Sequence, residues 1–145
     1  MFTFIYYIYM NNIIPYIITL TEKSDGIRPG KLVAINDYEI HMPIKRIFYL
    51  YDFNKDTNIN KRGCHAHQNT NQILIMLSGS VDIKTTHIVT HEECHFKLDS
   101  PSIALKLPIN NYINLNNFTE NAVMIVLCDT IFEDDIYIPT FKSHS

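Results

Sequence analysis

The sequence predicts an all-β protein, built as an antiparallel sandwich or barrel in a single domain. Short runs rich in Ile, Val, Tyr and Phe recur along the chain, and almost no stretch shows sustained helical periodicity. Clusters of Asn, Asp, Gly, Lys and Pro separate these runs, as turns separate strands. The 145 residues, of which 46% are hydrophobic, suffice for one core and are too few for two ordinary domains.

The predicted strands follow one another at close spacing. Ser78 and Gly79 form a tight turn between two of them, and the tail 132–145 has room for a helical turn. Residues 1–15 are expected to form an N-terminal extension or an extra strand, and residues 16–145 the barrel domain. The strands are expected at 16–20, 31–36, 45–53, 72–77, 80–85, 87–91, 95–98, 103–107, 112–116 and 123–129.

Charge and cysteine usage exclude several classes of function. The net charge of −3 provides no basic field for a phosphate backbone, so no nucleic-acid partner is expected. The apolar start lacks the features of a signal peptide and is too short to span a bilayer, so no membrane role is expected. Cys64, Cys94 and Cys128 form no CxxC pair and fit reduced thiols in the cytoplasm.

The segment 62–72, RGCHAHQNTNQ, carries the strongest chemical signal. His65 and His67 are two residues apart, so on a strand both side chains point to the same face. If that face lines a barrel, both imidazoles enter one cavity.

This spacing resembles the first motif of the cupin family, in which a His-x-His pair is followed by an acidic metal ligand. Gln72 stands at the position of the acid, and Ile113 stands where the second cupin motif has its histidine. Two histidines and an amide are a poor site for a divalent metal, so we expect no metal and no other cofactor. The pair is left available for acid–base chemistry.

With the flanking residues included, the resemblance narrows to the cupin-type dTDP-4-keto-6-deoxyglucose 3,4-ketoisomerases, the WxcM-like sugar ketoisomerases. The matching stretches are IKRIFYLYDF (44–53), RGCHAHQNTNQILIMLSGSVDI (62–83), LDSP (98–101), NFTENAVMIVLCD (117–129) and EDDIYIPTF (133–141). Three positions depart from the family pattern, namely Pro29, Gln68 and Ile113. The departures at Pro29 and Ile113 leave the product stereochemistry open.

The resemblance implies a single-domain cupin jelly roll (double-stranded β-helix), a homodimer, and a nucleotide-linked keto-deoxysugar as substrate. It also implies an isomerase that converts a dTDP-4-keto-6-deoxyhexose into its 3-keto isomer for deoxyamino-sugar biosynthesis. His65 and His67 are the expected catalytic residues. The expected substrate-binding residues are Arg46, Tyr49, Tyr51, Arg62 and Gln72.

Three alternatives remain at this point: a non-catalytic sugar-binding cupin, a 3,5-epimerase of related nucleotide sugars, and a metal-dependent cupin enzyme. Some other residues receive structural interpretations. Cys64 is expected to be a packed thiol, and residues 133–135 a solvated acidic turn. His87, His91 and His95 are expected on a solvated hairpin with Glu92 and Glu93 at its tip.

Overall fold

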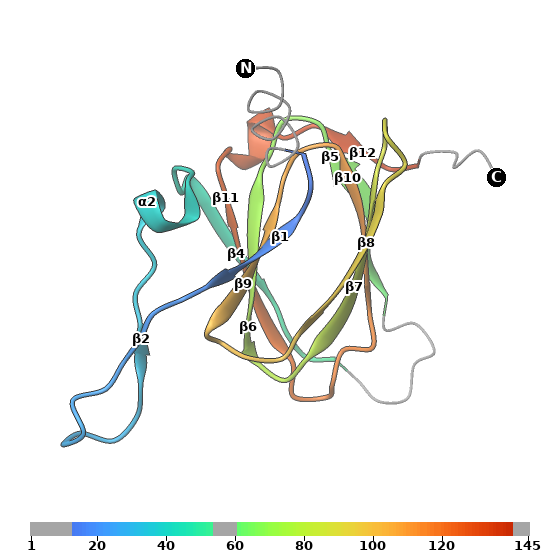
Figure 1. The fold of residues 1–145 in the computed structure, drawn as a ribbon. Coiled ribbons are helices and arrows are strands. Elements are labelled where there is room, and N and C mark those ends of the chain that lie inside the picture. The colour runs from blue at the N-terminus through green and yellow to red at the C-terminus, as the bar shows by residue number, and fades with distance from the viewer. Residues whose placement is uncertain (1–12, 54–60, 141–145) are drawn as a thin grey trace, which may run out of the picture.

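The computed structural model describes residues 13–53 and 61–140, and this part of the chain is almost entirely β (Figure 1). Most of the predicted extension, residues 1–12, lies outside the described residues. No helix in 13–53 or 61–140 is long and apolar enough to cross a membrane. The strands are β1 (Tyr16–Thr19), β2 (Glu22–Lys23), β3 (Leu32–Val33), β4 (Arg46–Leu50), β5 (Arg62–His67), β6 (Gln72–Ser78), β7 (Val81–His87), β8 (Glu93–Leu98), β9 (Ile103–Leu107), β10 (Asn111–Asn116), β11 (Val123–Cys128) and β12 (Tyr137–Ile138).

Two five-stranded antiparallel sheets face each other and enclose the core (Figure 1). The strand orders are β1-β9-β6-β11-β4 and β12-β5-β10-β7-β8, so the chain passes repeatedly from one sheet to the other. This is the jelly-roll arrangement, and it confirms the predicted all-β barrel. The short β2–β3 pair forms an arm that projects from the barrel body (Figure 1).

The apolar core has two parts because strand β6 is buried on both faces. Leu74 and Met76 point between the sheets, whereas Ile73 and Ile75 point outward, toward the short helix α2 (Asp37–Ile40). This alternation follows from the period of two along a strand. A fully buried Leu or Ile side chain contributes roughly 1.5–3 kcal/mol relative to an exposed one. Strand β6, which begins five residues after His67, is therefore firmly held on both of its faces.

Helix α2 replaces the end of a predicted strand. The strand expected at 31–36 ends at Val33, and Asn36 begins the helix instead. The Asn36 side chain and Glu39 form a capping box, in which a Glu39 oxygen accepts a hydrogen bond from the Asn36 backbone N–H at 3.0 Å. The strand prediction was wrong here because this local capping signal outweighed the β-branched residues before it.

The strand predicted at 87–91 was also wrong. Strand β7 continues to His87, and the chain then turns, with His91 in the left-handed region at φ 60°. The His87 N–H donates to the carbonyl oxygen of Glu92 at 2.9 Å and closes the turn. The backbone pairing of β7 with β8 thus overrides the β-branched composition of the turn segment.

Candidate active site

The histidines of segment 62–72 lie on β5, which a β-bulge interrupts just before them. Ile113 of β10 pairs with His65, while the next residue, Asn114, already pairs with Gly63, so Cys64 is the extra residue. Gly63 and Cys64 both have positive φ, 81° and 58°. Glycine suits the first position because a Cβ there would lie 2.6 Å from the Ile113 carbonyl oxygen. The bulge sets the direction in which the two histidines leave the strand.

The structure brings His65 and His67 together on one face of β5. Their Nε2 atoms are 3.0 Å apart, and the ring planes meet at 79°. His67 is 3% exposed, whereas His65 is only partly buried. The other ring nitrogen of His65, Nδ1, lies 2.8 Å from the carbonyl oxygen of Gly63. The bulge residue therefore also orients the imidazole that follows it.

Asp135 is the third member of the site. One carboxylate oxygen, Oδ1, lies 2.8 Å from Nδ1 of His67, and the Asp135 side chain is 0% exposed. The interpretation of 133–135 as a solvated turn was wrong for this residue, although Glu133 and Asp134 are exposed. No local signal distinguishes Asp135 from its acidic neighbours. Its position depends on the pairing of β12 with β5, which places Tyr137 opposite His67.

The buried carboxylate of Asp135 has two further hydrogen-bond donors. Nη2 of Arg46 lies 2.6 Å from Oδ2, and the Thr70 hydroxyl donates to Oδ1 at 2.8 Å. Burial by itself raises the pKa of Asp135, but the hydrogen bonds from Arg46, His67 and Thr70 together outweigh it and hold this pKa below its usual range. Asp135 is therefore ionised at neutral pH.

Backbone contacts fasten the Asp135 segment to the loop after the histidines. The N–H of Gln68 donates to the Ile136 carbonyl oxygen, and the N–H of Ile136 donates to the Asn69 side-chain oxygen, both at 2.9 Å. The Asn69 side-chain amide also donates to the carbonyl oxygen of Asp134. These bonds hold the segment that carries the Asp135 carboxylate against the loop that follows His67.

Tyr137 of β12 covers the histidine pair. Its ring centroid is 5.0 Å from that of His65 and 4.7 Å from that of His67. This packing contributes to the burial of His67, which lowers the pKa of that imidazole more strongly than the hydrogen bond to Asp135 raises it. The tyrosine was not singled out in the sequence, because only strand pairing brings it to the site.

The structure gathers two of the five predicted substrate-binding residues near the pair. Arg46 reaches it through Asp135, and its guanidinium also lies 3.4 Å from the Cys128 sulfur. Gln72 is buried and donates to the same sulfur at 3.6 Å. Both therefore lie on the inner side of the barrel, next to the site.

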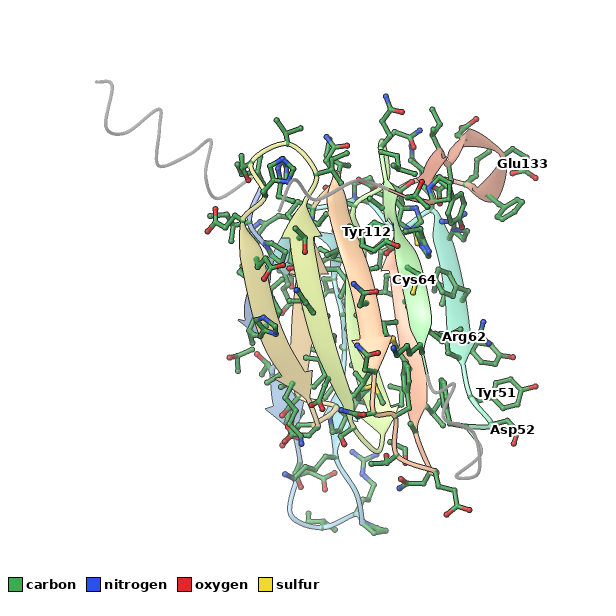
Figure 2. All side chains as sticks on the ribbon, turned by 90° about the vertical axis from the view of Figure 1, so that its right-hand side faces the viewer. Tyr51, Asp52, Arg62, Cys64, Tyr112 and Glu133 are labelled. Atoms are coloured by element: carbon green, nitrogen blue, oxygen red, sulfur yellow. The ribbon has the colours of Figure 1, made fainter. Side chains whose placement is uncertain are left out.

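The other three predicted substrate-binding residues lie elsewhere. Tyr49 and Tyr51 are 64% exposed, and Tyr49 alternates with inward-facing residues of β4, so it points away from Arg46. Arg62 is exposed at the start of β5, where it pairs with Leu115 of β10, away from the histidine end of the strand. Cys64 is exposed on the outer face of the β5–β10 sheet, so its interpretation as a packed thiol was wrong (Figure 2). Strand alternation places Cys64 opposite to the two histidines, and that face of the strand is exposed at this position.

Within the described residues, no group of three His, Cys, Asp or Glu side chains converges as a metal site would require. Gln72 and Ile113 occupy the two positions at which the cupin motifs carry further ligands. The site instead provides hydrogen-bond donors and acceptors, namely the facing imidazoles of His65 and His67, the buried Asp135 carboxylate and the Arg46 guanidinium. Such a set can move a proton between two neighbouring atoms of a substrate and can stabilise an oxyanion.

The antiparallel jelly roll, with its histidine pair facing the interior, defines a cupin fold. The family described as FdtA, WxcM-like, C-terminal matches residues 15–145, and the chain belongs to this family. A curated relative, the TDP-4-oxo-6-deoxy-α-D-glucose-3,4-oxoisomerase of Aneurinibacillus thermoaerophilus, is 31% identical over 117 residues, which is 79% of each chain. The family predicted from the sequence is thereby confirmed.

Solved structures give the same result. A 3,4-ketoisomerase from Helicobacter canadensis superposes with a TM-score of 0.77 at 32% identity, covering 88% of this chain and 92% of that one. The sugar 3,4-ketoisomerase QdtA from Thermoanaerobacterium thermosaccharolyticum, in complex with TDP, has a TM-score of 0.75 at 31% identity, covering 87% and 88%. The RmlC epimerase of Mycobacterium tuberculosis, at 15% identity and a TM-score of 0.67, shares the fold alone.

Proposed function

We propose that this protein is a nucleotide-sugar 3,4-ketoisomerase that converts a dTDP-4-keto-6-deoxyhexose into its 3-keto isomer, with His65 and His67 as the acid–base pair. One observation carries the proposal: the Nε2 atoms of His65 and His67 face each other at 3.0 Å, and the buried Asp135 contacts the His67 ring. The family relatives support the substrate class. One of the similar structures is a histidine-to-asparagine mutant of QdtA in complex with TDP-4-keto-6-deoxyglucose.

The reaction has two halves joined by an enediol intermediate, and each half involves two proton transfers. A base takes the proton from C-3, the electron pair forms the C-3–C-4 double bond, and the C-4 carbonyl oxygen receives a proton from an acid. In the second half a base takes the proton from the C-3 hydroxyl, the C-3 carbonyl forms, and C-4 receives a proton. Atoms and charge balance without an external oxidant. Imidazole suits both roles because its ordinary pKa is about 6.5, and such catalysis typically supplies about 10²–10⁴-fold.

Arg46 provides a donor for the oxygen that becomes negative. Its Nε and Nη1 atoms are buried, and within the described residues neither has a hydrogen-bond partner. Buried donors of this kind usually find an acceptor, and a sugar keto oxygen or enediolate would supply one. A well-placed donor to an oxyanion is worth about 3 kcal/mol. We therefore assign to Arg46 both the support of Asp135 and a contact with substrate.

We assign Gln72 to the inner wall of the site, where its amide lies against Cys128. Tyr49 and Tyr51 contact a nucleotide sugar in this site only if the substrate, or a second subunit, extends over the outer surface. Arg62 contacts it only if the substrate reaches the exposed start of β5. Their assignment to substrate binding remains a prediction that substitution of each residue tests.

The proposed activity is tested by NMR of the thymidine-linked 4-keto-6-deoxyglucose incubated with the protein in heavy water. We expect the signals of the 3-keto isomer. Any deuterium that is incorporated should lie at C-4 of this product or at C-3 of the remaining 4-keto substrate. Deuterium at C-5 would indicate a 3,5-epimerase, and binding without turnover would indicate a sugar-binding cupin. A requirement for added metal, lost on chelation, would indicate a metal-dependent cupin enzyme.

We also propose that the protein is a homodimer that acts in the cytoplasm. Exposed apolar side chains extend along the outer face of β4, with Ile47 57% exposed and Tyr49 64% exposed. Apolar patches of this kind on sheets are typical of subunit interfaces. All three cysteines are free, as a reducing compartment requires.

A further inference from the structure

We propose that His65 and His67 share a single extra proton in the resting protein, and that Asp135 is the positioning residue that fixes where this proton lies. The inference rests on the proposed function for its catalytic meaning. Its structural content, the charge and tautomers of the two rings, can be measured without substrate.

The contacts of the four ring nitrogens determine how many hydrogens the histidine pair carries. Nδ1 of His65 faces the Gly63 carbonyl oxygen at 2.8 Å, and a carbonyl oxygen only accepts, so this nitrogen carries a hydrogen. Nδ1 of His67 faces the Asp135 carboxylate at 2.8 Å and carries one for the same reason. The two Nε2 atoms, 3.0 Å apart, need one hydrogen between them. Three hydrogens on two rings make the pair a monocation, because two neutral rings hold only two.

Neither other charge state fits these contacts. Removing the shared proton sets two Nε2 lone pairs against each other, or else leaves one Nδ1 lone pair facing an acceptor oxygen. Adding a second proton sets two N–H groups against each other at 3.0 Å. An unmade hydrogen bond in a buried site costs about 1–3 kcal/mol, and more when a charged group is involved. The monocation is the state in which all three contacts are hydrogen bonds.

The charged groups around the pair act in opposite directions. Asp135 is buried and ionised, and its contact with Nδ1 of His67 favours a positive charge on the pair, whereas Arg46 opposes that charge. Arg46 balances Asp135 from the other side at 2.6 Å. The remaining titratable neighbours are the Cys128 thiol of β11 and the Tyr137 phenol of β12. Burial raises the pKa of Tyr137, so the phenol adds no charge at neutral pH.

Burial decides which ring carries the positive charge. His67 is almost fully buried and His65 is partly open to solvent, so the charge is better solvated on His65. His67 is then the neutral ring, with Nδ1–H toward Asp135 and an Nε2 lone pair that accepts from His65. Burial also lowers the pKa of His67, which agrees with this distribution.

This charge state matches what the isomerisation needs. Each half-reaction requires one acid and one base at the same time, and the roles exchange between the halves. A pair that holds one proton provides both, and after the first half it still holds one, on the other ring. The single positive charge of the pair also favours the negative charge that develops on the sugar oxygen as the enediol forms.

The test is ¹⁵N NMR of the histidine-labelled, substrate-free protein, which reports the protonation of each ring nitrogen. We expect both Nδ1 atoms protonated at pH 7 and one proton shared by the two Nε2 atoms. A wild-type spectrum with two neutral rings, or with two doubly protonated rings, at pH 7 overturns the proposal.

The positioning role of Asp135 is tested with Asp135→Asn, and the adjacent, exposed Asp134→Asn is the matched control. The side-chain amide introduced by Asp135→Asn can donate to Nδ1 of His67 and so reverse the tautomer of that ring. We expect changed His67 ring-nitrogen shifts and a kcat lower by about 10²–10⁴-fold with KM little changed, as for an acid–base site with a wrong tautomer. The control should match wild type. An unchanged His67 tautomer in folded Asp135→Asn protein contradicts the role. Absent turnover by a wild-type protein with the expected spectrum would instead contradict the proposed function.

Discussion

A carboxylate oxygen of Asp135 lies 2.8 Å from Nδ1 of His67, although 68 residues separate the two in the chain. The contact joins the segment after the last long strand to the motif that carries the predicted chemistry. It is also the link through which Arg46 of β4 acts on the histidines.

The two histidines should be separately essential. We expect His65→Asn and His67→Asn each to lower kcat by at least about 10²-fold, because either change removes one partner of the proton transfer. TDP binding, measured by calorimetry, should change little. His95→Asn, on the exposed side of β8, is the control and should keep wild-type turnover. Full activity in either His65→Asn or His67→Asn would refute the pair.

Arg46 should contribute strongly to stability. Arg46→Met leaves the buried Asp135 carboxylate without its cationic partner, and breaking a buried pair in this way costs about 3–5 kcal/mol. Urea unfolding followed by circular dichroism measures the loss. Arg28→Met removes an ion pair to Asp25 in which the arginine side chain is 85% exposed, and its effect should stay within about 1 kcal/mol. Equal effects of the two changes would contradict the buried role.

Asp135 should make the protein sensitive to acid. Its pKa is lowered in the folded state, so around the ordinary carboxyl value of about 3.9 the unfolded chain binds more protons than the folded one. The stability that Asp135 contributes is thus present above that pH and is lost as the pH falls through the folded pKa. We expect Asp135→Asn to flatten the fall in unfolding free energy between about pH 5 and pH 3. Parallel curves for wild type and variant would disprove this.

The bulge before the histidines should tolerate no side chain at Gly63. A Cβ there meets the Ile113 carbonyl oxygen at 2.6 Å, and φ is 81°. We expect Gly63→Ala to destabilise the fold by about 2–4 kcal/mol, from the positive φ and the forced shift of β5, and to reduce kcat through misplacement of His65. Gly30→Ala is the matched control, since φ there is 92° but nothing lies within 4 Å of the added Cβ. It should show only the backbone strain, about 1–2 kcal/mol, and normal turnover.

The outer face of β4 should mediate the proposed dimer. Tyr49→Glu introduces a charge into the exposed apolar surface beside Ile47, so we expect light scattering to show a shift from dimer toward monomer. Tyr38→Glu, at a tyrosine of α2 that is 71% exposed, should leave the mass unchanged. A wild-type protein that is monomeric at all concentrations would rule out the dimer.

The sequence by itself determined the fold class and the family. Apolar runs and the turn residues between them are local signals, so they predict strands such as 103–107, which the structure reproduces as β9. The i, i+2 spacing likewise placed His65 and His67 on one face, and the structure brings their rings together. These features depend on neighbouring residues only.

The tertiary structure alone decided the surroundings of the pair. Asp135 and Tyr137 reach the histidines because β12 pairs with β5, a contact between distant segments that leaves no periodic signal. The exposure of Cys64 and of Tyr49 depends on which face of each strand the core covers. The local sequence pattern determines which side chains share one face of a strand. The pairing of distant strands determines which other residues pack against that face. The charge state of the histidine pair depends on this long-range pairing.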